Sequence, residues 1–144
     1  MPATPRRARS FGGDSSHQRL MMANLAASLF AAEGITTTEA KAKALRPIAE
    51  KLITKAKKAQ EGPMRVHRIR QIQGYLGDRE MTHKLVNDVA PRYIERNGGY
   101  TRILREARNS LGDNAPRAIF EFVDRADEDE IETAAAGKAK GQKK

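Results

Sequence analysis

The sequence predicts an α+β fold in which a small three-stranded sheet, made of one strand and a C-terminal hairpin, is covered by about four helices. Apolar residues recur at helical spacing through much of the first two thirds of the chain. A short threonine-rich run interrupts this pattern, and two β-rich runs separated by turn-forming residues follow it. The isolated strand is therefore expected to join the hairpin across the intervening helices.

The first helix is expected at residues 17–33. Ser15 and Gln18 have the spacing of a capping box, and Gly34 interrupts the helical pattern. The expected apolar stripe consists of Met21, Leu25, Ser28, Leu29 and Ala32. The residues that follow, 35–38, combine one isoleucine with three threonines and predict a short strand.

The second helix is expected to begin at Thr38 or Glu39 and to continue to about residue 59. Pro47 lies inside this run. Because proline has no backbone N–H, we expect it to remove one hydrogen bond and to bend the helix. The expected apolar stripe consists of Leu45, Ile48, Leu52 and Ala56, with Ile53 beside it.

Two shorter helices are expected next. The third carries Val66, Ile69 and Ile72 on its apolar side and ends at Gly74 and Gly77. The fourth is capped by Asp78 and reaches Pro91.

The last predicted element is a hairpin. Two β-rich runs, at residues 100–108 and 118–124, flank a loop at residues 109–116 that contains glycine, aspartate and asparagine. Phe120 and Phe122 alternate along the second run, so they are expected to share one face of the last strand.

The composition favours one domain with a tail at each end. A chain of 144 residues is long enough for one compact domain, which we expect at residues 17–125. Residues 1–16 are expected to form a basic arm. Residues 126–144, acidic and then lysine-rich, are expected to form a disordered tail.

Several classes of protein are disfavoured by what the sequence lacks. It has no cysteine, which excludes disulfides and thiolate metal sites. The histidines lack metal-ligand spacing, and no nucleotide-binding glycine motif is present. No apolar run is long enough to span a membrane. We expect a cytoplasmic protein that is not an enzyme, with no cofactor, no metal, no small-molecule substrate and no membrane partner.

The positive charge is concentrated in the first half of the chain. The net charge is +9, and residues 1–75 hold 14 of the 27 Lys and Arg residues against 5 of the 18 Asp and Glu residues. Such a charge distribution favours a polyanionic partner, either a nucleic acid or an anionic membrane surface. The membrane alternative is the weaker one, because no predicted helix combines a bulky aromatic apolar face with a basic face. The alternative is a charge excess that only keeps the protein soluble, although solubility alone does not require this asymmetry.

The second helix and the arm carry this charge. The basic residues of the arm are Arg6, Arg7 and Arg9, and those of the helix are Lys41, Lys43, Arg46, Lys51, Lys55, Lys57 and Lys58. Guanidinium groups and the threonine hydroxyls nearby are common partners of phosphate and sugar. A solvated helix face explains the lysines taken alone. Together, arm, helix and hydroxyls favour backbone recognition of a folded RNA, with a nucleoid-type DNA-binding protein as the alternative.

Two blocks of residues resemble the bacterial large-subunit ribosomal protein L17 family. The first begins at His17 and runs through the threonines to Ala56 and Lys57. The second contains the runs GGYTRI and GDNAP, followed by Glu121. The resemblance covers about residues 5–125. It implies an α+β structural protein of the large ribosomal subunit that binds large-subunit ribosomal RNA and lies beside neighbouring ribosomal proteins near the polypeptide exit tunnel.

The resemblance also implies which residues face the RNA. In the arm, the first helix and the start of the second they are Arg9, His17, Arg19, Asn24, Thr37, Thr38, Lys41 and Lys43. Farther along the second helix they are Arg46, Lys51 and Lys57. Tyr100, Thr101 and Arg102 match the second block, and for these three residues packing within the hairpin and contact with RNA remain equal alternatives.

Overall fold

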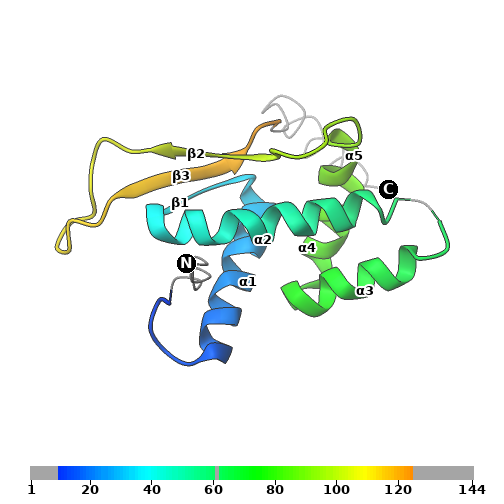
Figure 1. Ribbon diagram of the computed structural model, residues 1–144, viewed down its shortest axis with the longest axis horizontal. Helices are drawn as coiled ribbons and strands as arrows, with labels where there is room; N and C mark the ends of the chain where they lie inside the picture. The colour runs from blue at the N-terminus through cyan, green and yellow to red at the C-terminus, as the bar shows by residue number, and fades with distance from the viewer. Residues whose placement is uncertain (1–9, 61, 125–144) are drawn as a thin grey trace, which may run out of the picture.

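A computed structural model describes residues 10–60 and 62–124 of the chain. The expected tail at residues 126–144 and the arm arginines at residues 6, 7 and 9 lie outside these ranges. The elements are α1 (Ser15–Ala32), β1 (Gly34–Thr38), α2 (Glu39–Lys57), α3 (Arg65–Leu76), α4 (Arg79–Lys84), the π-helical turn η1 (Leu85–Val89), α5 (Ala90–Arg92), β2 (Thr101–Arg105) and β3 (Arg117–Phe122) (Figure 1). The predicted α+β fold is confirmed.

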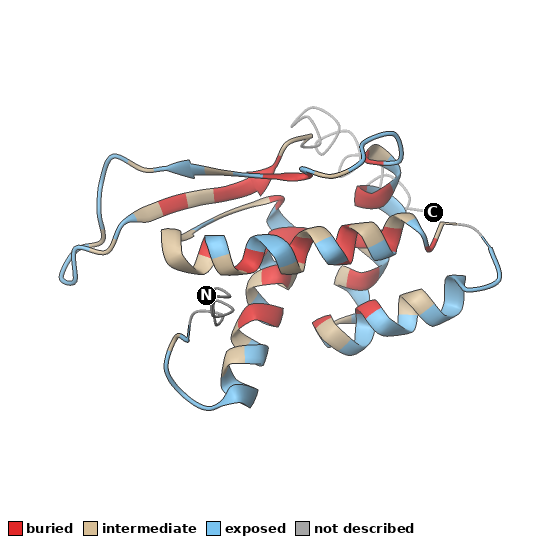
Figure 2. Cartoon of the chain, in the orientation of Figure 1, coloured by how far each residue is buried: buried red, intermediate tan, exposed pale blue. Residues whose placement is uncertain are grey.

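The sheet has the strand order β1-β3-β2, and both pairs are antiparallel. The isolated strand therefore does join the hairpin across the helices, as predicted. Ile35 and Ile103 are both register partners of Phe120, so the three side chains share one face of the sheet. Phe120 and Phe122 are fully buried on that face. Figure 1 shows α1 and α2 on one side of the sheet, and Figure 2 shows buried residues gathered where these elements meet.

Helix α1 begins two residues earlier than predicted. The N-cap is Asp14, whose carboxylate accepts a hydrogen bond from the His17 backbone N–H at 2.8 Å, so the assignment of Ser15 to the cap was wrong. The buried face consists of Met22, Ala23, Ala26, Leu29 and Phe30, whereas Ser28 is exposed. Residues 20–32 are apolar on almost every side of the helix, so periodicity alone did not select the buried face.

The junction between α1 and β1 is made by Glu33 rather than by Gly34. Glu33 has a φ of 59°, a left-handed conformation that ends the helix, and its backbone N–H donates to the Leu29 carbonyl at 2.7 Å. Its nearly buried carboxylate accepts two hydrogen bonds from the Arg92 guanidinium, at 2.8 and 2.9 Å. Its carbonyl accepts from the Phe122 backbone N–H at 3.1 Å. One residue thus joins α1, α5 and β3.

Helix α2 lies across the inner side of the sheet. Its buried residues are Ala42, Leu45, Ala49, Leu52, Ile53 and Ala56. Leu45, Leu52, Ile53 and Ala56 were predicted. Ala42 and Ala49 were not, and the predicted Ile48 is only half-buried at the edge of the stripe. Pro47 lies inside the helix, as expected, and is exposed.

The fourth predicted helix continues from α4 through η1 into α5. Asp78 caps it as expected, accepting from the Glu80 and Met81 backbone N–H groups. Pro91 has no N–H to donate to the Val86 carbonyl five residues earlier, and the Gln60 side chain donates to that carbonyl instead, at 2.5 Å. The end of α2 is thereby fastened to the π-helical turn.

Two expectations for α3 were wrong. The helix ends at Gly77, which has a φ of 71°, and Gly74 lies inside it. Of the three residues predicted on the apolar side, Val66 is exposed, whereas Ile69 is half-buried and Ile72 is buried as expected. Leu76 is the other buried residue of the helix. The first turns of the helix extend away from the core, so an apolar residue there, such as Val66, is not buried even though its position in the helical pattern predicts it.

The Glu33 junction gives a stability prediction. Arg92→Met removes two charge-assisted hydrogen bonds from a carboxylate that is almost fully buried, and we expect the free energy of unfolding to fall by about 3 kcal/mol in urea denaturation. The double variant Glu33→Gly with Arg92→Met should recover part of this loss, because glycine removes the buried charge and adopts the positive φ without strain. A double variant as unstable as Arg92→Met would contradict this explanation.

Candidate nucleic-acid interface

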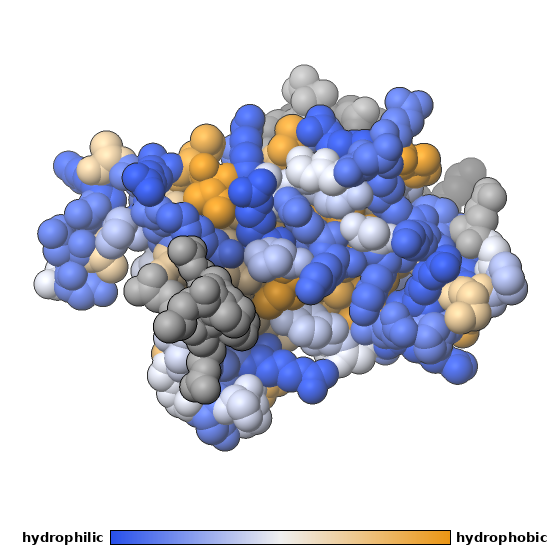
Figure 3. Space-filling view, in the orientation of Figure 1, coloured by the Kyte–Doolittle hydropathy of each residue, from blue (hydrophilic) through white to orange (hydrophobic). Residues whose placement is uncertain are grey.

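The outer face of α2 displays a row of basic residues. Lys43, Lys51 and Lys55 are exposed and separated by multiples of four residues, a spacing that places them on one side of a helix. Lys58 continues the row, and Arg46 is exposed beside it. Figure 3 shows this face of the molecule, with hydrophilic side chains over α2 and apolar surface between them. The helix thus buries one side and presents cations on the other.

Some of these basic residues form ion pairs with acids of the same chain, and others do not. Lys43 forms an ion pair with Glu39 at 2.5 Å, and Arg46 lies 3.4 Å from a Glu50 carboxylate oxygen. Hydrogen bonds from Lys43 and Arg105 hold the pKa of Glu39 below its ordinary value, so this acid stays charged at neutral pH. By contrast, no carboxylate in residues 10–60 or 62–124 lies within ion-pair distance of Lys51, Lys55 or Lys58.

Lys57 has a structural contact that sequence reasoning did not find. Its ammonium group donates to the Arg96 carbonyl at 2.5 Å and to the Tyr100 hydroxyl at 3.2 Å. It also lies 5.1 Å from the centre of the Tyr100 ring. These contacts hold the segment before β2 against α2, so Lys57 is half-buried and not part of the exposed row.

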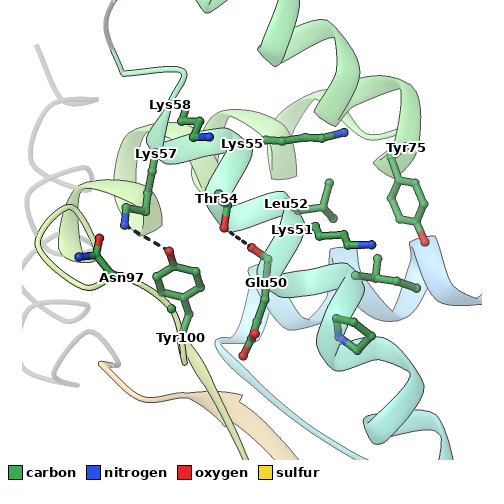
Figure 4. Close-up of a pocket in the computed structure, with 13 residues that line it drawn as sticks. Glu50, Lys51, Leu52, Thr54, Lys55, Lys57, Lys58, Tyr75, Asn97 and Tyr100 are labelled. Atoms are coloured by element: carbon green, nitrogen blue, oxygen red, sulfur yellow. Dashed lines mark hydrogen bonds between the residues drawn. The ribbon is translucent and has the colours of Figure 1, made fainter.

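Two grooves border the basic row. One, of about 840 Å³, follows the outer side of α2 and is lined by Lys51, Lys55, Leu52 and Tyr100, among others (Figure 4). The other, of about 610 Å³, lies between α1 and α2 and is lined by Phe11, Arg19, Met22 and Lys43, among others. Three residues line both grooves: Pro47, Ile48 and Tyr75.

The residues predicted on α1 and at the start of α2 are only partly brought together. Arg19 is exposed and lines the groove that also contains Lys43. His17 is exposed in the first turn of α1. Asn24 is exposed but lies two positions from the groove-lining Met22, so it points to another side of the helix. Lys41 is half-buried.

The threonines and the hairpin residues lie apart from the row. Thr37 is half-buried and Thr38 is the N-cap residue of α2. Tyr100 and Thr101 are buried, so their side chains pack inside the protein. Arg102 extends from the opposite face of the sheet and pairs with Glu121 at 2.6 Å.

Helix α3 adds basic residues that the sequence-based selection left out. Arg65 and Arg70 are exposed, and Arg68 donates to the Lys58 carbonyl at the end of α2. No acidic residue occurs in α3. A signal was present in the sequence, because the basic residues recur without any acid between them, but only the contact with Lys58 shows that they extend the α2 surface.

The chemistry of this surface is that of a binding face. Exposed ammonium and guanidinium groups bind phosphate oxygens, and apolar groove walls accept flat rings. Within the described residues, no group of three His, Asp or Glu side chains is arranged to hold a metal ion. Nor does any helix in that part of the chain have the length and apolar character needed to cross a membrane.

The family comparison agrees with this geometry. The family model described as ribosomal protein L17 matches residues 21–123, which include every described helix and strand apart from the first turns of α1. The matched segment contains the whole basic row and both groove walls contributed by α2 and α3. The chain therefore belongs to the ribosomal protein L17 family, whose members are structural proteins of the large ribosomal subunit.

Proposed function

We propose that this protein binds large-subunit ribosomal RNA through the outer face of α2 and thereby supports the structure and assembly of the subunit. The observation that carries the proposal is the set of charges at Lys51, Lys55 and Lys58, which lie side by side along α2 and its C-cap and have no carboxylate within ion-pair distance among the described residues. The packed helix fixes the backbone positions of these lysines relative to one another, so no backbone ordering is needed when they bind phosphates.

Other residues extend the proposed contact around this centre. Arg19 and Lys43 border the second groove, and Arg65 and Arg70 continue the surface along α3. Lys43 and Arg46 keep intramolecular acid partners, so each contributes less to phosphate binding than a lysine without one. His17, in the first turn of α1, and the arm arginines at residues 6, 7 and 9, which lie outside the described residues, complete the proposed contact.

We further propose that the hairpin meets neighbouring large-subunit proteins. It carries Arg102 and Leu104 on the face turned away from the helices, and its loop ends in the fully exposed Leu111. Isolated apolar groups at a projecting tip are suited to a protein neighbour rather than to phosphates. In this proposal the chain has no catalytic step, and binding and shape are its whole contribution.

The first test measures the salt dependence of binding to purified large-subunit ribosomal RNA. Replacing Lys51, Lys55 and Lys58 by alanine should weaken binding and reduce the slope of log affinity against log salt by about 2 to 3, because each phosphate contact contributes about 0.7 to 0.9. The matched control replaces Arg79, Arg96 and Arg108, which are exposed and lie outside α2 and its basic row, so it removes the same charge. Equal slopes for the two triple variants would contradict the proposed interface.

The second test locates the protein in the cell extract. Gradient sedimentation at low magnesium separates the ribosomal subunits, and the tagged chain should move with the large subunit and stay there after a moderate salt wash. The Lys51, Lys55 and Lys58 alanine variant should be washed off at lower salt than the wild type. Sedimentation with DNA would instead support a nucleoid-type DNA-binding protein.

A further inference from the structure

The two grooves beside the basic row have an apolar floor that phosphate binding does not explain. Pro47, Ile48 and Tyr75 line both grooves, so they form one continuous apolar strip between α2 and α3. Pro47 is exposed, and Ile48 and Tyr75 are half-buried. A surface that contacts only phosphates needs cations, and such an apolar strip beneath it would stay in contact with water at a cost in free energy.

The cations stand directly beside this strip. Lys51 and Lys55 follow Ile48 at intervals of three and seven residues, so the three side chains lie along one edge of α2. Figure 4 shows both lysine side chains extending toward the side of α2 on which Tyr75 lies. On the other side of the strip, Arg19 and Lys43 line the second groove. The apolar strip therefore has two cations on each side, and the one acid that lines the first groove, Glu50, is paired with Arg46.

Tyr75 has the properties of a stacking platform. It is the only tyrosine of the chain that is not buried, since Tyr93 and Tyr100 are 0% and 4% exposed. Burial of part of the ring raises the pKa of its phenol, so the group is neutral at physiological pH. Neutral aromatic faces accept nucleic-acid bases of any sequence.

We propose that this strip receives an unpaired RNA base, which stacks against Tyr75 and Pro47 while its flanking phosphates bind Lys51 and Lys55. The inference rests on the proposed function and adds the kind of nucleotide that the interface takes. The surrounding lysines and arginines favour a nucleotide over an apolar protein segment. Every nucleotide combines a flat ring with an anionic phosphate, whereas an apolar protein segment offers no charge that these cations would bind.

Double-stranded RNA does not fit a groove that combines an apolar strip with flanking cations. Bases inside duplex RNA are covered by their neighbours in the stack, so a duplex offers the groove only phosphates and sugars. An unstacked loop or bulge nucleotide exposes its ring and keeps its phosphates. The groove consequently favours a single-stranded or bulged segment over continuous helix.

The test compares three short RNA ligands of equal length: an oligouridine, an abasic ribose-phosphate oligomer and an RNA duplex. The full chain should bind the oligouridine about tenfold more tightly than the abasic oligomer, in line with the loss caused by removing one stacked base. Tyr75→Ala should abolish this difference while leaving the salt slope unchanged, because the lysines remain. Tyr75→Phe, which keeps the ring, should retain the difference.

A second variant guards against loss of folding. Pro47→Ala removes the exposed ring and restores a backbone N–H inside α2, so it should raise stability while weakening oligouridine binding several-fold. Binding of the abasic oligomer to this variant should match that of the wild type. If Pro47→Ala binds oligouridine as tightly as the wild type, Pro47 does not contact the stacked base.

Tyrosine fluorescence gives an independent readout. The chain has three tyrosines and no tryptophan, and two of the tyrosines are buried, so a base stacked on Tyr75 should quench part of the emission. Oligouridine should cause this quenching and the abasic oligomer should not. In Tyr75→Phe the quenching should disappear while binding persists.

The outcomes separate this inference from the proposed function. Equal affinity for the oligouridine and the abasic oligomer, with no quenching, overturns the base-binding groove but leaves phosphate binding by α2 intact. Failure of the Lys51, Lys55 and Lys58 variant to change ribosomal RNA binding overturns the proposed function itself. If large-subunit proteins freed of RNA quench the Tyr75 emission and RNA does not, the groove binds a protein, and the inference is also overturned.

Discussion

The antiparallel pairing of β1 with β3 determines where the other elements lie. The two strands are about 80 residues apart in sequence, and they pair along the whole of β1. No loop separates β1 from the helices on either side, since Glu33 ends α1 and Glu39 begins α2. The Glu39 backbone N–H even donates to the Pro116 carbonyl beside β3, at 2.9 Å. Once β1 is paired, both long helices leave the sheet in fixed directions.

Small residues then allow α2 to approach the core closely. Ala42, Ala49 and Ala56 are completely buried and follow one another every seven residues, so they lie on the same side of the helix. The distance between packed elements depends on the side chains at the contact, and alanine keeps it short. Because this side is packed, the helix backbone has little freedom to move, so the attachment points of the lysines on the opposite side are fixed relative to one another.

Much of this arrangement could be predicted from the sequence, because α2, β1 and the hairpin have strong local patterns. That the isolated strand joins the hairpin followed from its need for a partner, whereas no local pattern indicated that β3 would be the central strand. The buried face of α1 was not predictable, since its apolar residues surround the helix. The role of Lys57 depends on Arg96 and Tyr100, about 40 residues away, and the strip at Pro47, Ile48 and Tyr75 exists only once α3 has packed. Long-range contacts of this kind leave no local signal.

The position of β2 at an edge of the sheet affects whether two copies of the chain can pair with each other. The described sheet ends at β1 and β2, so β2 offers unpaired backbone groups on its outer side, where a second copy could add a strand. Arg102 and Arg105 stand on this strand and pair with Glu121 and Glu39 of their own chain. Long charged side chains on an edge strand disfavour its pairing with another strand. The hairpin edge is thus a poor template for a second copy of the same chain.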